Sequence, residues 1–213
     1  MKLLVTRESV RRLLRWTQRI LLASAVLALS YCGVVLVDTW IFQRQASAEF
    51  ERQLDVERAA RDDASRSAKS DAAVAPPAIA PDGLIGRIEI ERIGLSAVIF
   101  EGIDKATLRH AVGHIPSTAL PGHPGNTGLS AHRDSFFRPL RNIQRSDIIA
   151  VTTLRGAFRY RVVSTRVVAP TEVSVLDPSK TEVLTLVTCH PFYFVGSAPN
   201  RFIVRAERIA DRS

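Results

Sequence analysis

An uncharged apolar run from Ile20 to Val37 restricts the possible folds of this 213-residue chain more than any other feature. Its eighteen residues are just enough for a helix to cross a hydrocarbon core about 30 Å thick, at about 1.5 Å per residue. Trp16 before the run and Trp40 after it are typical of side chains that anchor a helix at the membrane interface. We therefore predict a transmembrane anchor over residues 20–42.

Basic residues are concentrated ahead of this run. Residues 1–19 contain six Lys or Arg against one Glu, and such positive segments stay on the cytoplasmic side of a membrane. We therefore expect a cytoplasmic N-terminus at 1–19 and an extracytoplasmic position for everything after the span. A cleavable signal peptide is the alternative, but its apolar region is usually about 7–15 residues long. The string DTWIF that follows the run makes a poor cleavage site, so the uncleaved anchor is favoured.

Residues 43–81 separate the anchor from the rest of the chain. The first part is rich in Ala, Glu, Arg and Gln, and its few apolar residues, such as Phe50 and Leu54, do not sustain a heptad. This composition predicts a solvated helical or partly disordered stalk. The last part, DAAVAPPAIAP, predicts an extended and semi-rigid linker. We place the main domain at residues 82–213.

The main domain changes to short β-like runs separated by turn residues. Ile88 and Ile90 alternate with charged residues, as in a strand with one buried face. Asp104 can cap a short helix in KATLRHAV, which Gly113 stops. About eight short strands with one or two short helices, in some 130 residues, fit a closed or nearly closed β-barrel. We therefore predict a mainly β fold dominated by antiparallel pairs.

The net charge of +8 does not indicate a nucleic-acid partner. The basic excess comes from two separate parts of the chain, and no continuous Lys/Arg tract is present. Nucleic-acid-binding proteins also tend to interleave basic groups with stacking aromatic residues on one face, a pattern that is missing here. We therefore expect no nucleic acid among the partners.

Cys189 is the residue best suited to carry chemistry. The chain has two cysteines, and the other, Cys32, lies in the apolar run, so no disulfide is expected within the main domain. The strand LTLVTC ends on Cys189, a loop containing Pro and Gly follows, and Arg201 comes twelve residues later. A lone thiol in this setting is a candidate nucleophile. The alternative is a small buried hydrophobe, since unpaired cysteine is among the most buried residue types.

A thiol nucleophile needs a proton acceptor and a group that stabilises the developing oxyanion. The candidates are the five histidines His110, His114, His123, His132 and His190. His132 closes the short strand GLSA, and strand ends in a barrel can meet at one rim. His190 adjoins Cys189, but its side chain points to the opposite face if the strand continues. A histidine taken singly is more often structural, so the residues alone leave the choice open.

Three strings resemble the sortase family, and within it the class D type. They are HIPSTALPGHPGN, GNTGLSAHRDSFFRPL (125–140) and TLVTCHPFYFVGSAPNRFIVRAER (185–208). The TLxTC motif of the family is complete from Thr185 to Cys189, and the resemblance covers about residues 84–210. One departure is the alanine at position 131, where the family often has glycine.

The resemblance implies a membrane-anchored cysteine transpeptidase. Cys189 would be the nucleophile, His132 the general acid/base, and Arg201 the partner of the oxyanion or substrate carbonyl. These residue types suit the roles, because a thiolate is nucleophilic, an imidazole titrates near neutrality, and a guanidinium stays charged. Thr188 and His114 are further candidates for contact with the bound peptide. The acidic residues form no run like a calcium loop, so we expect no metal and no other cofactor.

The expected substrate is a protein with an LPxTG-like sorting signal, which the enzyme would cleave through a thioester acyl-enzyme. The expected second partner is an amine from a peptidoglycan peptide or a pilin. Two alternatives stay open: a cysteine hydrolase at the same Cys/His site, and a non-enzymatic anchored β-barrel adaptor with Cys189 in its core. An L,D-transpeptidase is disfavoured, because that pattern has glycine before the cysteine and Thr188 stands there.

Overall fold

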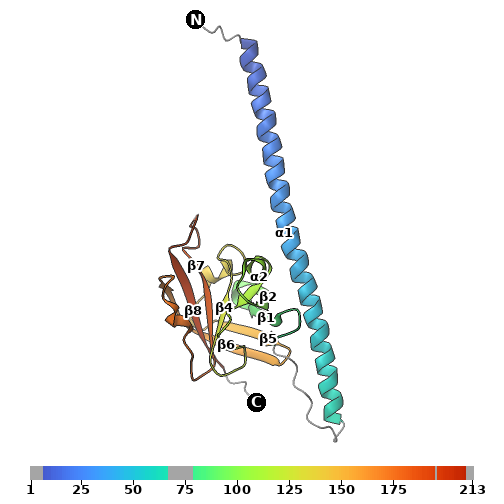
Figure 1. The fold of residues 1–213 in the computed structure, drawn as a ribbon, viewed down its shortest axis with the longest axis vertical. Helices are drawn as coiled ribbons and strands as arrows, with labels where there is room; N and C mark the ends of the chain where they lie inside the picture. Colours follow the sequence, from blue (N-terminus) through green and yellow to red (C-terminus); the bar gives the residue numbers. More distant parts are fainter. Residues whose placement is uncertain (1–6, 67–78, 195, 210–213) are drawn as a thin grey trace. The chain divides into compact units, whose positions relative to one another are not determined.

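The computed structural model describes residues 7–66, 79–194 and 196–209, with the backbone alone for 7–10 and 61–66. The chain divides into two compact units, residues 1–42 and residues 43–213. The second unit takes in residues that the sequence assigned to the stalk. Most of the predicted Ala/Pro linker lies outside the described residues. Figure 1 shows the described elements along the chain.

The helix α1 runs without a break from Arg7 to Arg66 (Figure 1). It contains no proline, and its residues are mainly good helix formers such as Ala, Leu, Glu, Gln and Arg. The apolar side chains of its first part, among them Leu21, Leu27 and Leu36, are exposed. This part is long and apolar enough to cross a membrane, so it is a candidate membrane anchor.

Eight strands form a closed barrel in the order β1-β2-β3-β4-β7-β8-β6-β5. The strands are β1 Leu84–Ile90, β2 Leu95–Glu101, β3 Val112–His114, β4 Asn126–Ser130, β5 Ile148–Thr153, β6 Gly156–Val168, β7 Val183–His190 and β8 Asn200–Arg208. Two neighbouring pairs, β2 with β3 and β4 with β7, are parallel, and the others are antiparallel. Closure leaves the barrel without an open sheet edge. The predicted eight-stranded barrel is therefore confirmed.

The runs AFRYRVVST and RVVA both lie in the long strand β6. One short helix differs from the sequence prediction. The helix α2 spans only Lys105–His110, and Val112, predicted as helical, begins the short strand β3. Asp104 caps α2 as predicted, since its carboxylate accepts hydrogen bonds from the backbone N–H groups of Ala106 and Thr107 at 2.8 and 3.1 Å. The 3-10 helices among the described residues are η1 Glu91–Ile93, η2 Arg138–Asn142 and η3 Val173–Leu176.

Apolar side chains from every strand fill the barrel, with Tyr160 and Phe137 among the largest. Ile88 and Ile90 are fully buried, while Glu89 between them is exposed, as the alternating pattern predicted. A second apolar group, formed by residues of β6, β7, β8 and η3, lies outside this core, and we call it the outer cluster. It consists of the buried residues Val168, Val175 and Ile203 with Leu176 and Val187 packed against them.

The part of α1 in the second unit packs against the barrel and is not solvated on all faces. Phe50 is completely buried, and the guanidinium carbon of Arg87 lies 5.8 Å from the centre of its ring. Arg87 also forms an ion pair of 2.9 Å with Glu51. The side chain of Gln43 donates to the carbonyl oxygen of His110 at 2.5 Å. The expected solvated stalk therefore begins as a helix docked on the barrel.

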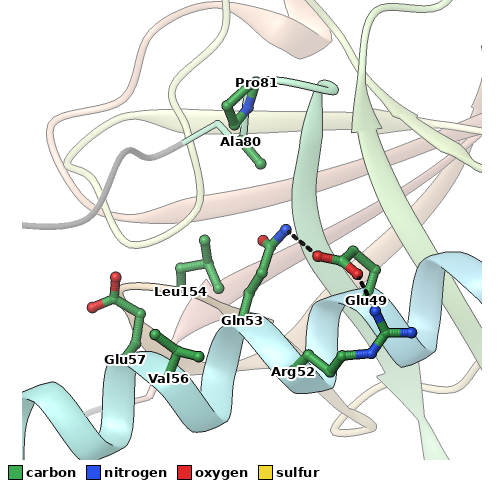
Figure 2. Close-up of a pocket in the computed structure, with 8 residues that line it drawn as sticks. All are labelled: Glu49, Arg52, Gln53, Val56, Glu57, Ala80, Pro81 and Leu154. Carbon is green, nitrogen blue, oxygen red and sulfur yellow. Dashed lines mark hydrogen bonds and ion pairs between the residues drawn. The ribbon is translucent and has the colours of Figure 1, made fainter.

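A pocket of about 300 Å³ lies between this helix and the barrel (Figure 2). Its lining consists of Glu49, Arg52, Gln53, Val56, Glu57, Ala80, Pro81 and Leu154. On the helix side, Glu49 accepts hydrogen bonds from Gln53 at 3.2 Å and from Arg52 at 2.8 Å. None of the predicted site residues lines this pocket, so it is separate from the strand ends described next.

Candidate active site

Cys189 and Arg201 lie directly opposite each other in the antiparallel pair of β7 and β8. Residues that are directly opposite in such a pair place their side chains on the same face of the sheet. Val187 and Ile203 form the next pair on this face, two positions away from the rim along β7 and β8, and they belong to the outer cluster. Cys189 is partly exposed. The thiol and the guanidinium therefore share the outer face of the barrel, beside an apolar cluster.

His132 follows the end of β4, which runs parallel to β7. Beyond the last strand pair, the N–H of Ala131 donates to the carbonyl oxygen of Val187 at 3.4 Å. The hydroxyl of Thr188 donates to the carbonyl oxygen of Ala131 at 2.8 Å. These two bonds hold the residue before His132 against the residues before Cys189. Both predicted catalytic residues thus stand at the same rim.

Thr188 itself points into the barrel. It pairs with Phe202, which packs against the barrel core, and only 2% of its surface is exposed. Its hydroxyl is already engaged with the backbone ahead of His132. In this arrangement Thr188 supports the site from inside the barrel, whereas the predicted contact with a bound peptide would require a change of partner.

Arg201 holds its guanidinium at the C-terminal end of the loop between β7 and β8. Its Nη1 donates to the carbonyl oxygens of Asn200 at 3.0 Å and Ala198 at 3.3 Å. A guanidinium has five N–H donors, so further donors are available for a ligand. His132 is exposed, and no hydrogen bond joins the side chains of His132, Cys189 and Arg201 in the described part of the chain.

His190 lies on the other face of β7, as its place next to Cys189 predicted. Its ring stacks on Phe202, with centres 6.1 Å apart, and meets the edge of Phe192 at 5.9 Å. Phe192 and Phe202 both pack against the barrel core. Strand alternation thus turns His190 away from the face that carries Cys189 and Arg201.

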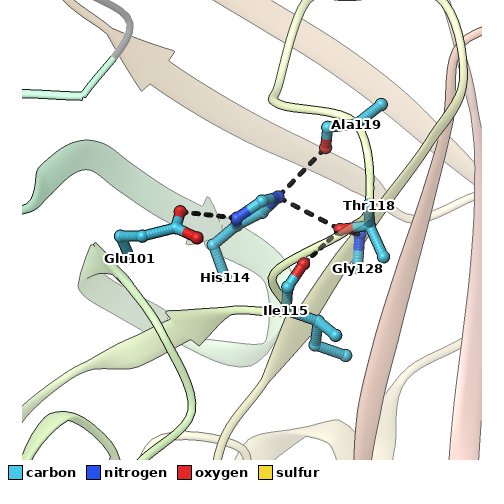
Figure 3. A network of polar contacts seen from close by, with 6 residues as sticks. All are labelled: Glu101, His114, Ile115, Thr118, Ala119 and Gly128. Carbon is cyan, nitrogen blue, oxygen red and sulfur yellow. Dashed lines mark hydrogen bonds and ion pairs between the residues drawn. The ribbon is translucent and has the colours of Figure 1, made fainter.

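His114 is a buried link between strands (Figure 3). It is 3% exposed, and its Nδ1 lies 2.7 Å from a carboxylate oxygen of Glu101. Its Nε2 lies 3.1 Å from both the carbonyl oxygen of Ala119 and the hydroxyl of Thr118, which in turn donates to the carbonyl oxygen of Ile115. Both ring nitrogens are therefore occupied. The expectation that His114 contacts a peptide does not fit this burial, because the ring is used to hold the segment ahead of β4.

Comparison with known protein families assigns the chain to a family. The profile of the sortase domain matches residues 88–209, which is more than half of the chain. The chain belongs to the sortase family. The resemblance inferred from the three sequence strings is confirmed.

Characterised sortases resemble the chain in sequence and in structure. Sortase D of Bacillus subtilis is 34% identical over 125 residues, which are 58% of this chain and 63% of that protein. Sortase A of Listeria monocytogenes is 31% identical over 112 residues, which are 51% of this chain and 50% of that protein. The chain thus spans less than two thirds of the length of these relatives.

Among solved structures, the Sortase D5 transpeptidase of Clostridium perfringens superposes with a TM-score of 0.63 at 28% identity, covering 79% of this chain and 99% of that one. Sortase C-1 of Actinomyces oris superposes with a TM-score of 0.57 at 27% identity, covering 75% of this chain and 99% of that one. Both structural matches extend over more of the chain than the sequence matches to the curated relatives do.

The alanine at position 131, where sortases often have glycine, is accommodated without loss of backbone hydrogen bonds. Ala131 is 4% exposed, and both its N–H and its carbonyl group are bonded to β7. The additional methyl group is therefore packed inside the barrel core.

Sequence reasoning did not single out Arg133, the residue after His132. Its Nη2 donates to the carbonyl oxygens of Phe194 at 2.7 Å and Gly196 at 2.9 Å, in the loop that follows β7. The only signal in the sequence was its place in the sortase-like string AHRD, which does not show what an arginine there would contact.

No metal-binding site is evident in the described part of this sortase. No group of three or more His, Cys, Asp or Glu side chains there lies close enough together to hold a metal ion. The expectation that the chemistry needs no cofactor stays a prediction.

Proposed function

We propose that this sortase is a cysteine transpeptidase in which Cys189 is the nucleophile, His132 the general acid/base and Arg201 the oxyanion partner. The observation that carries the proposal is the direct pairing of Cys189 with Arg201 on one face, at the rim where His132 follows β4. A guanidinium on the same face as the nucleophile can donate hydrogen bonds to a developing oxyanion.

The reaction follows from these three groups. The sulfur of Cys189 attacks a backbone carbonyl carbon of the sorting signal, and Arg201 stabilises the negative oxygen of the tetrahedral intermediate. The C–N bond then breaks, and His132 gives its proton to the departing amine, which leaves a thioester. A second amine attacks the thioester, His132 takes the proton from that amine, and Cys189 leaves as the thiolate. The net change is the exchange of one amide bond for another.

The substrate class is a protein with an LPxTG-like signal, as in the family. The outer cluster lies on the same face as Cys189, with Val187 and Ile203 as the next pair along β7 and β8. Apolar surface next to the nucleophile suits an aliphatic side chain of the peptide. The amine is a peptidoglycan peptide or a pilin lysine.

Acyl-enzyme trapping tests the proposed chemistry. The full chain in detergent micelles is mixed with an LPxTG peptide and analysed by intact mass. Wild type should gain the mass of the N-terminal peptide fragment, hydroxylamine should remove it, and triglycine should convert it to a ligated product. Cys189→Ala should give no adduct, because Cys32 is the only other thiol. An adduct on the alanine variant would refute the nucleophile.

A hydrolase is the second candidate, because the exposed His132 and the partly exposed Cys189 are accessible to water. Product analysis with and without triglycine separates the two activities. A non-enzymatic adaptor with Cys189 in its core fits less well, because that thiol lies outside the barrel core.

The topology is also proposed: the N-terminus is cytoplasmic and the barrel is extracytoplasmic. The support is the candidate anchor with arginines at its start. An impermeant maleimide applied to intact cells, or to spheroplasts if an outer membrane is present, should label Cys189. Labelling that requires lysis would reverse the orientation.

A further inference from the structure

Arg133 joins the segment that carries His132 to the loop that follows β7, the strand that carries Cys189. It follows His132 in the chain, and its Nη2 donates to the carbonyl oxygens of Phe194 and Gly196, at 2.7 and 2.9 Å. Its guanidinium carbon also lies 5.9 Å from the centre of the Phe194 ring. Phe194 and Gly196 belong to the loop between β7 and β8, which starts directly after His190.

Phe192 packs against the barrel core at the start of this loop, but the two aromatic side chains that follow it are exposed. Tyr193 is 78% exposed and Phe194 is 46% exposed. Hydrogen bonds from a charged donor are roughly twice as strong as those between neutral groups. The two bonds from Arg133 are therefore a principal link between this loop and the segment after β4. Arg141 contacts the same loop differently, with its guanidinium carbon 5.7 Å from the centre of the Tyr193 ring.

We propose that Arg133 is a positioning residue of this sortase. By holding the loop after β7 against the segment after β4, it fixes the separation between Cys189 and His132. The inference rests on the proposed function, because it assigns the nucleophile and the acid/base to these two residues. Arg133 needs no contact with the substrate for this role.

The expected effect follows from the position of His132 beyond the last pair of β4 with β7. The pairing of β4 with β7 ends at Ser130 and Val187, so the barrel ladder itself does not fix His132. A misplacement of about 1 Å between reacting groups can cost about 100-fold in rate. Loss of the Arg133 bonds should therefore lower kcat by about 10- to 100-fold, with a smaller change in KM.

Three variants of the full chain in detergent micelles separate the hydrogen bonds from charge and bulk. Arg133→Met removes the donors and keeps an unbranched side chain. Arg133→Lys keeps a charged nitrogen with several donors, and both observed bonds come from a single nitrogen. Arg141→Met is the matched control. It removes a cation that contacts the same loop through Tyr193, and it leaves the hydrogen bonds to the carbonyls of Phe194 and Gly196 in place.

Two readouts are needed. Hydrogen exchange followed by mass spectrometry reports how well the loop between β7 and β8 is held. Steady-state kinetics with an LPxTG peptide and triglycine report kcat and KM. Arg133→Met should speed exchange in the loop about tenfold or more and lower kcat by about 10- to 100-fold. Arg133→Lys should recover most of both quantities, and Arg141→Met should resemble wild type.

The proposal is overturned if Arg133→Met leaves loop exchange unchanged, or if exchange rises while kcat stays at the wild-type value. Failure of wild type to turn over the peptide would instead count against the proposed function. In that case the rate of alkylation of Cys189 by iodoacetamide replaces kcat, with peptide mapping to separate it from Cys32. A change of several-fold in the alkylation rate of Arg133→Met supports the positioning role of Arg133, and an unchanged rate refutes it.

Discussion

Replacement of Thr188 by valine removes one hydroxyl with almost no change of shape. That hydroxyl donates to the carbonyl oxygen of Ala131 at 2.8 Å, and both residues are buried. The carbonyl would be left without this donor in a place that water does not reach. Leaving a buried acceptor unsatisfied costs about 1–3 kcal/mol of unfolding free energy. For a domain of this size that corresponds to a fall in Tm of about 2–12 °C.

The same bond holds the residue ahead of His132, so the change should reach the chemistry. If the whole loss appears in the transition state, kcat falls by about 5- to 150-fold. Calorimetry and peptide kinetics on Thr188→Val measure the two effects, and Thr188→Ser, which keeps the hydroxyl, is the matched control for kcat. Thr185→Val calibrates the stability effect, because Thr185 is equally buried and donates to Asn126 at 2.7 Å. If Thr188→Val has wild-type kcat and Tm, the proposed support of His132 is wrong.

Three other predictions address the site and the barrel. His132→Ala should remove nearly all transpeptidation in the peptide assay, whereas His190→Ala should keep most of it. The reverse result would mean that His190, and not His132, is the general acid/base. Arg201→Lys keeps the charge but loses the planar donors, so its kcat should fall by about 10²–10³-fold, and a wild-type rate would place the oxyanion elsewhere. The Arg92 side chain, hydrogen-bonded to Asp147, holds the pKa of that carboxyl below its usual value, despite the opposing effect of burial. The resulting stabilisation is present above the unfolded-state pKa of about 4 and is lost as pH falls through the lower folded-state pKa. Acid unfolding followed by circular dichroism should therefore show a steeper loss for wild type than for Asp147→Asn, and parallel curves would refute this.

The barrel could be predicted because its longer strands carry local signals. Alternation in β1 and the apolar runs of β7 and β8 are visible in single segments. Val112–His114 carries no such signal: three residues are too few for a period, and its pairing is parallel to β2. The strand is recognised only by its pairing with β2 on one side and β4 on the other, which closes the barrel at this point. The predicted number of about eight strands agrees with the barrel.

The docked part of α1 was missed for a similar reason. The less exposed positions 43, 46, 47, 49, 50, 53, 54 and 57 follow helical spacing, but only Ala46, Phe50 and Leu54 among them are apolar. From the sequence, a polar residue such as Gln43 is expected to be solvated. In the structure its side-chain amide accepts a hydrogen bond from the backbone N–H of Val98 and donates one to the carbonyl oxygen of His110. Contacts of this kind depend on tertiary structure, so a stripe of mixed character cannot be recognised before the barrel surface is known.

The motif residues also show where sequence reasoning about a site stops. Strand ends and alternation favoured His132 over His190 as the partner of Cys189, whereas Arg201 was assigned through the resemblance to sortases. The pairing of β7 with β8 places Cys189 opposite Arg201. Around these residues, side chains donate to backbone carbonyls: Thr188 to Ala131, Arg133 to Phe194 and Gly196, and Arg201 to Ala198 and Asn200. The pairing of β4 with β7 stops at Ser130, so these bonds take over where the barrel ladder ends. We therefore expect substitutions of Arg133 and Arg201 to change kcat more than they change the stability of the barrel.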